Sequence, residues 1–320
     1  ERIPLVATLV KKTEFTDEEI AALDAFVSGQ GFHYWHHPRH PVDHQVSRYL
    51  HLPPGEQTRF RQGHFLRLDA VTDDSPFFFN FYKWRSLVRH DPRDTGTTPA
   101  TGQRMLLVMI VQAVLFSVVL ILWPLGRLPR GRFELRPAAL LAYFAALGVG
   151  FIFIEISLMQ RFVLFLGFPT YSLSVVLFSL LIFTGLGSAF SGRIPRVSRR
   201  LPVMVTAVLT VILCTFLLVA PGLFRANLAA SLPVRILISV ALIAPLGVVL
   251  GMFFPVGIRL IEAADRRLVP WAWAVNGCTT VVGTIAATMI AMAYGFDVVM
   301  VLALLVYGAG CGALQFMRRA

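Results

Sequence analysis

The chain has 320 residues, of which 56% are hydrophobic, and its mean hydropathy is +0.68. These values exclude an ordinary soluble domain and indicate a multi-pass membrane protein. The net charge of +11 comes from residues 105–320, which hold 16 arginines and five acidic residues, whereas residues 1–104 are neutral overall. Because the excess lies in short segments between apolar runs and no nucleic-acid motif is present, we expect contact with lipid headgroups and no nucleic acid as a partner.

The first part of the chain shows a short strand–helix–strand pattern. An apolar run at residues 3–10 predicts a buried strand, and Thr16 with Glu19 forms a capping box that begins a helix. Residues 32–35 could form a second strand. Such a unit is too small to bury a core of its own. We therefore interpret residues 1–70 as the C-terminal remnant of an α/β domain whose body lies upstream, and we expect the chain to be a fragment.

A histidine-rich stretch lies within this region. Imidazole clusters can bind zinc and other transition metals, so the stretch is a candidate metal site. Two prolines interrupt any helix that would align the rings, and no cysteine accompanies them, which favours a solvated loop. The histidines are His33, His36, His37, His40 and His44.

Residues 71–104 are predicted to be a junction and linker. They begin with an acidic turn that contains Asp73 and Asp74 and continue into aromatic residues up to Trp84. One interpretation places the two carboxylates at the rim of an active site. The other, which we favour, is a turn that pins an aromatic plug between a soluble domain and the membrane surface, where aromatic rings are enriched.

Residues 105–320 are predicted to be a transmembrane helical domain. They contain about seven apolar runs, each near the roughly 20 residues that a helix needs to cross a bilayer. The predicted fold is therefore mainly α, a polytopic transmembrane helix bundle preceded by an α/β tail. The predicted spans are residues 105–125, 138–166, 172–192, 202–220, 234–258, 271–295 and 297–317.

The arginines are unevenly divided between the two sets of loops. The segments at 126–137, 193–201 and 259–268, with the C-terminus, hold 13 of them, whereas the alternate connections hold two. The positive-inside rule places the arginine-rich side in the cytoplasm, and with seven spans this puts residues 1–104 on the opposite side. Three explanations stay open: one span does not cross, the basic segment 83–104 outweighs the loops, or the soluble domain is external.

Three polar residues, Glu155, Gln160 and Arg161, interrupt the second span. Charged side chains inside a membrane span are costly and by default indicate function. Glu155 and Arg161 lie on different faces of the helix, so we interpret Arg161 as an interfacial anchor that snorkels, on the face of Ser157. Glu155 needs a proton, a partner from another helix or a cationic ligand. It is a structural glutamate, a cation or proton site, or an accident of the span boundary.

Other spans contain an asparagine, small residues and prolines. Asn276 can form a hydrogen bond to a neighbouring helix, which favours a structural role, with ligand contact as the alternative. Small residues allow close helix approach, and prolines permit the broken helices that transporters use to bind substrate. The residues concerned are Gly185, Gly187, Pro245, Gly247, Gly251 and Pro255.

Four motifs occur together in this chain: TDDSPFFFNFYKW at 72–84, the stretch 150–188 that begins GFIFIEISLMQRF, GMFFPVGIRL at 251–260, and PWAWAVNG at 270–277. In combination they resemble a family of bacterial multi-pass proteins in which a spermidine-synthase-like domain of the class I methyltransferase type is fused to membrane spans. The resemblance implies that residues 3–40 end a Rossmann-like domain. The chain departs from the family at Ser75, where a basic residue would be expected.

The resemblance implies S-adenosylmethionine-type group transfer in the complete protein, with the cofactor-binding and catalytic residues upstream of this chain. No catalytic residue is assigned here, and no cofactor is expected within the chain. The first hypothesis is the membrane portion of such a fusion in the bacterial inner membrane, with the lipid bilayer and the upstream part of the α/β domain as partners. The alternatives are a transporter or channel for a cation such as a polyamine, using Glu155, and a structural membrane anchor.

Overall fold

The structure is a computed structural model that describes residues 6–64, 66–84, 101–126, 137–195, 200–262 and 266–315. The chain divides into two compact units, Glu1–Asp69 and Ala70–Ala320. The described residues are mainly helical and contain no β-strand. This confirms the predicted helical bundle, whereas the Rossmann-like tail is not observed.

The described part of the first unit consists of three short helices joined by loops. Helix α1 (Asp17–Gly29) begins with the predicted capping box: Thr16 Oγ1 accepts from the Glu19 N–H at 3.3 Å, and Glu19 Oε2 accepts from the Thr16 N–H at 2.9 Å. Helices α2 (Gln45–His51) and α3 (Pro54–Gly63) follow.

The two segments that we predicted as strands have a different structure. The described residues 6–10 and the residues 32–35 form no strand. A strand needs a neighbour that satisfies its backbone hydrogen bonds, and the described part of this unit supplies none. Ile20 is the one buried apolar side chain in this described part, so α1 has little core to pack against.

In the second unit, the described residues supply seven helices that are long and apolar enough to cross a membrane. The chain is thus a multi-pass membrane protein, as predicted, and its surface suits a lipid bilayer. The helices are α5 (Thr101–Gly126), α6 (Pro137–Leu166), α7 (Pro169–Gly192), α8 (Arg200–Asn227), α9 (Leu232–Glu262), α10 (Val269–Tyr294) and α11 (Phe296–Gln315).

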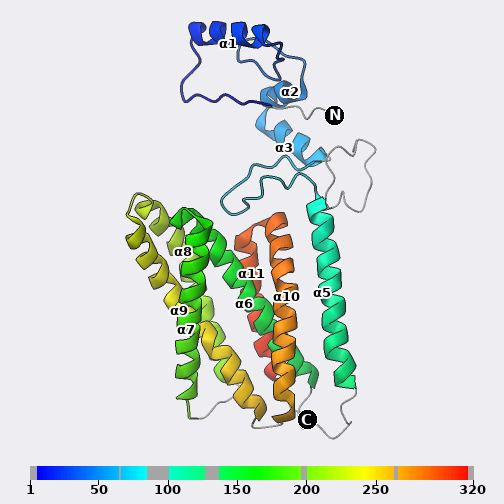
Figure 1. The fold of residues 1–320 in the computed structure, drawn as a ribbon, viewed down its shortest axis with the longest axis vertical. Helices are drawn as coiled ribbons and strands as arrows, with labels where there is room; N and C mark the ends of the chain where they lie inside the picture. The colour runs from blue at the N-terminus through cyan, green and yellow to red at the C-terminus, as the bar shows by residue number, and fades with distance from the viewer. Residues whose placement is uncertain are drawn as a thin grey trace. The chain divides into compact units, whose positions relative to one another are not determined.

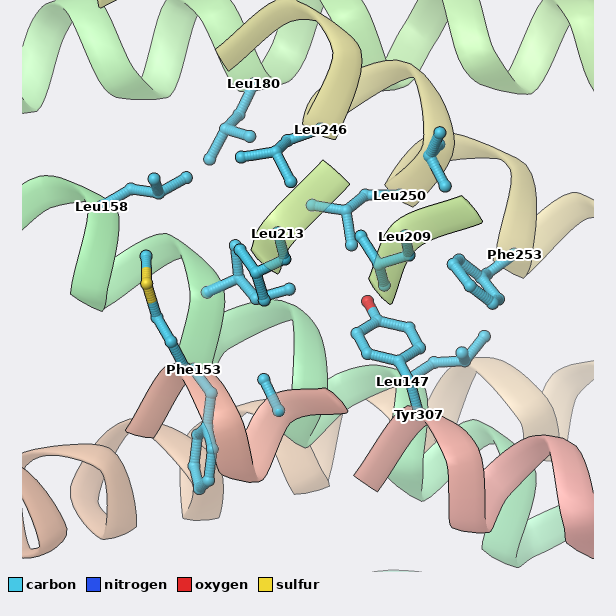
Figure 2. Packing of buried hydrophobic residues seen from close by; sticks show 14 of the residues in the cluster. Leu147, Phe153, Leu158, Leu180, Leu209, Leu213, Leu246, Leu250, Phe253 and Tyr307 are labelled. Carbon is cyan, nitrogen blue, oxygen red and sulfur yellow. The ribbon is translucent and has the colours of Figure 1, made fainter. Parts of the chain in front are cut away.

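Helix α6 is the central helix and packs against α7, α9, α10 and α11 (Figure 1). Two glycines make these contacts close. A Cβ at Gly148 would lie 2.5 Å from the Asn276 carbonyl of α10, and a Cβ at Gly150 would lie 2.6 Å from the Tyr307 ring of α11. Figure 2 shows the buried apolar side chains that α6, α7, α8, α9 and α11 contribute around Tyr307.

Helix α9 is unbroken although Pro245 and Pro255 lie inside it, so the broken helix that these prolines would permit is not observed. Neighbouring helices can satisfy the backbone groups that a proline frees. Arginines at the two ends of α9 also hold its neighbours: Arg235 Nη1 donates to the Phe165 carbonyl at 2.9 Å, and Arg259 donates to the Ser191 carbonyl at 2.9 Å. Both contacts cap the C-terminal carbonyls of a helix with a positive charge.

The two ends of the bundle differ in composition. We call the end where α6, α8 and α10 finish and α5 begins the junction end (Figure 1). Helices α5, α7, α9 and α11 finish at the opposite end. In the sequence, each of them is followed directly by a segment that contains at least two arginines. We call this opposite end the arginine end.

Candidate functional site

Residues 70–84 are bound to the turn between α10 and α11 at the junction end. The Asp74 carbonyl accepts from the Phe296 N–H at 3.0 Å, and its carboxylate Oδ1 accepts from the Asp297 N–H at 2.8 Å. Gly295 has a φ of +90°, which favours glycine, and a Cβ there would overlap the Asp74 carboxylate. The turn is therefore shaped to receive a carboxylate at the positive end of the α11 dipole.

Arg161, near the end of α6, supplies the positive charge at this site. Its guanidinium forms an ion pair with Asp297 and attracts the Asp74 carboxylate. The Arg161 side chain is only 17% exposed, so our interpretation of it as a snorkelling anchor is corrected. Two carboxylates attract it more directly than lipid headgroups can. Ser157 lies on the same face, as predicted, and donates to the Phe296 carbonyl at 3.4 Å.

A pair of buried amides fixes the other half of the segment. Asn80 Nδ2 donates to the Met292 carbonyl of α10 at 3.1 Å, and Gln103 Nε2 donates to Asn80 Oδ1 and to the Tyr82 carbonyl. Gln103 lies in the first turn of α5, although the sequence had suggested a linker there. Buried amides are stable only when their hydrogen bonds are made, so these contacts hold the segment to both helices. We call Asp74, Asn80, Gln103, Arg161 and Asp297 the junction clasp.

The two carboxylates of the predicted acidic turn have different environments. Asp73 is exposed, whereas Asp74 is half-buried. Partial burial raises the pKa of the Asp74 carboxyl above its ordinary value of 3.8, and this outweighs the attraction of Arg161 and a backbone hydrogen bond, which both lower it. The folded protein therefore binds a proton at Asp74 more readily than the unfolded chain does.

This difference predicts that acid stabilises the clasp. Because the folded-state pKa of Asp74 is raised, its contribution to stability is largest below 3.8 and is lost as the pH rises through the raised value. We expect Asp74→Asn to flatten the pH dependence of the thermal unfolding midpoint in detergent over that interval. Asp73→Asn, at the exposed neighbouring position, is the matched control and should follow the wild type. Equal curves for Asp74→Asn and wild type would contradict the prediction.

Glu155 lies outside the clasp, in the interior of α6. Ile152 lies one turn earlier on the same face of α6 and packs closely against Gly283 of α10: a Cβ at Gly283 would lie only 2.7 Å from the Ile152 side chain. This register places Glu155 beside the next turn of α10. The side chain is half-buried, and it forms no hydrogen bond or ion pair with any residue that the structure describes. The sequence predicted that its partner must come from another helix or a ligand, and no described helix provides one.

The remaining predicted ligand residues are not brought together with Glu155 by hydrogen bonds. Asn276 Nδ2 donates to the Phe144 carbonyl of α6 at 3.3 Å, which is the inter-helix bond that we favoured. Its own carbonyl accepts from the hydroxyls of Thr279 and Thr280, so the asparagine is part of the α6–α10 contact. Gln160 is half-buried near the end of α6.

Several histidines of the first unit form local hydrogen bonds in its loops. His37 Nδ1 accepts from the backbone N–H groups of Arg39 and His40 at 3.1 Å and 3.0 Å, and His44 caps α2 through the Val46 N–H at 3.2 Å. His36 contacts Ser47 at 3.4 Å, and His33 is exposed. Among the described residues, no three His, Cys, Asp or Glu side chains are grouped so that they could hold a metal ion.

Of the five residues of the junction clasp, the sequence pointed to Asp74 and Arg161 as candidates but not to Asn80, Gln103 or Asp297. The available signal for Asp297 was an acidic residue directly after Gly-Phe in the short break between two apolar runs. Comparisons of the chain with protein-family models, curated proteins and solved structures found no match. The junction clasp and Glu155 are therefore the two features of the molecule that point to a function.

Proposed function

We propose that this chain is the membrane-embedded part of a spermidine-synthase-like fusion protein in the bacterial inner membrane. The junction clasp is the observation that supports it. The hydrogen bond that Asp74 accepts from the Asp297 N–H and the one that Asn80 donates to the Met292 carbonyl fix the segment that follows the first unit, which is what an anchor for a preceding domain requires. A flexible linker would tether the preceding domain but leave it free to move. An anchor that also restrains the domain therefore needs fixed contacts of this kind.

The residues of this chain do not fit an S-adenosylmethionine-type cofactor. In α/β domains such cofactors bind at the carboxyl ends of parallel strands. The described part of the first unit contains three short helices and no strand, so it offers no such edge. In this proposal the cofactor is bound by other residues of the complete protein, and no catalytic step is assigned to this chain.

Binding measurements on two proteins test this proposal. The complete protein in nanodiscs should bind S-adenosylmethionine or its decarboxylated form in equilibrium dialysis and transfer a group to an amine, as followed by mass spectrometry. The present chain alone should bind neither compound. If the complete protein also fails to bind either nucleoside, the fusion-enzyme proposal is wrong and the anchor function alone is left.

Glu155 supports a second candidate function, a transporter or channel for a small cation such as a polyamine. A half-buried carboxylate in a membrane span attracts a cation or a proton when, as for Glu155 among the described residues, no hydrogen bond or ion pair satisfies it.

Removal of the Glu155 charge is expected to abolish transport in this second function. Proteoliposomes with Glu155→Gln should take up labelled spermidine at least about tenfold more slowly than wild type, because the binding charge is lost while the side-chain shape is kept. Glu262→Gln, at the exposed end of α9, is the control and should transport normally. Equal fluxes in all three proteins would exclude Glu155 as the binding carboxylate.

A further inference from the structure

Residues 77–80 form a tight turn with two phenylalanines at its tip. The Asn80 N–H donates to the Phe77 carbonyl at 3.2 Å, which closes the turn. Between them, Phe78 is 70% exposed and Phe79 is 88% exposed. Exposed turn tips normally contain Gly, Pro, Asn, Asp or Ser. Two adjacent exposed phenyl rings at such a position indicate a surface that contacts an apolar partner.

Both ends of this turn are fixed to membrane helices. The Phe77 ring stacks on the Phe296 ring at 5.8 Å between centroids, and the Asn80 side chain donates to the Met292 carbonyl at 3.1 Å. Met292 lies in the last turn of α10, which ends at Tyr294. The tip is therefore held at the level where a membrane span ends.

Other aromatic side chains are exposed at the same junction end. Tyr294, at the end of α10, is 73% exposed. Phe168 and Tyr171, at the start of α7, are 64% and 43% exposed. Tyr rings gather at this depth because the membrane–water interface accommodates an amphipathic ring, and apolar phenyl rings beside them can leave water for the adjoining acyl chains. Phe78 and Phe79 thus lie at the same end of the bundle as other exposed aromatic rings that suit the membrane–water interface.

We propose that Phe78 and Phe79 insert into the interfacial region of the bilayer that surrounds the bundle, at its junction end. The partner is phospholipid, because the tip lies beside the end of a lipid-facing helix and carries apolar rings without a charge. The Phe79 ring also meets the Phe81 ring edge-on, with 6.2 Å between the two centroids, so a third apolar ring lies next to the tip. This inference does not depend on the enzyme or transport proposals.

Photocrosslinking identifies the partner of the tip. The full chain carries benzoylphenylalanine in place of Phe79, is reconstituted in phosphatidylethanolamine–phosphatidylglycerol vesicles and is irradiated. We expect a mass increase equal to one phospholipid, because the benzophenone reacts with C–H bonds within its reach. Phe178, 66% exposed on α7, is the lipid-facing control.

The products separate the alternatives. A lipid adduct at position 79 with a yield close to that at 178 supports the proposal. A crosslink from position 79 to residues 6–64, a crosslinked dimer, or no adduct while position 178 reacts would each overturn it. The same probe at position 78 repeats the test without changing Phe79, so a folding defect of one variant does not decide the result.

Discussion

Gly187→Val is expected to unfold the contact between α7 and α9. A Cβ at residue 187 would overlap the backbone carbonyl of Val248, and a Cβ at Gly251 would overlap the carbonyl of Thr184. Backbone atoms cannot rotate away as a flexible side chain can, so the two helices must separate. Overpacking typically costs about 1–3 kcal/mol of the free energy of unfolding, and the overlap with backbone atoms places this variant at the upper end. In a membrane, where close packing holds helices together, that loss has no hydrophobic compensation.

Gly185 provides a matched control on the same helix. A Cβ at Gly185 meets no atom within 4 Å, so Gly185→Val changes only the local helix propensity. The midpoint of unfolding by sodium dodecyl sulfate should fall sharply for Gly187→Val and stay near the wild-type value for Gly185→Val. Similar midpoints for the two variants would show that the α7–α9 contact is looser than the structure indicates.

The helices of the bundle were predictable because lipid restricts the choice of structure. A long apolar run must satisfy its own backbone hydrogen bonds in a membrane, and a helix is the simplest way to do so. The second predicted span, 138–166, therefore matches α6 to within one residue at its start. The sequence also indicated that Gly187 and Gly251 allow close approach, since small side chains have that effect on any helix. It could not show which helices they bring together.

The junction clasp was only partly predictable because its members are far apart in the chain. Asp74 and Asp297 are separated by 223 residues, and their hydrogen bond exists only because segment 70–84 folds onto the α10–α11 turn. The polar surroundings of Gln103 suggested a linker, whereas the structure starts α5 at Thr101. Helix packing decides such contacts, and local sequence patterns do not specify helix packing.

In the first unit, contacts between neighbouring residues were predictable, whereas pairing between distant segments was not. Its capping box at Thr16 was predictable because the two hydrogen bonds join neighbouring residues. The strands that we predicted at 3–10 and 32–35 are not observed in the described residues 6–10 and 32–35, because a strand depends on pairing with other strands of a sheet, which a local pattern does not show. The histidine count raised a metal site as a candidate beside the favoured solvated loop, and His37 and His44 accept backbone N–H groups, a use that composition cannot distinguish from metal binding.

Arg161→Ala is expected to open the junction clasp. Without the guanidinium, the Asp297 carboxylate loses its ion pair and the Asp74 carboxylate loses its nearest positive charge. Removal of one partner of a buried ion pair costs about 3–5 kcal/mol. Since the Asp297 side chain is 58% exposed, solvent screens part of this loss, and we expect about 2 kcal/mol.

The measurement combines stability with a double-mutant cycle. Arg161→Ala, Asp297→Ala and the double variant are compared by unfolding in sodium dodecyl sulfate, with Arg200→Ala, at an exposed position, as the control. A true pair gives a double variant less destabilised than the two single losses together. Arg161→Ala should also raise the pKa of Asp74, because Arg161 lowers it in the wild type, so acid should stabilise this variant up to a higher pH. Additive losses and an unchanged pH profile would show that Arg161 does not hold segment 70–84 to the bundle.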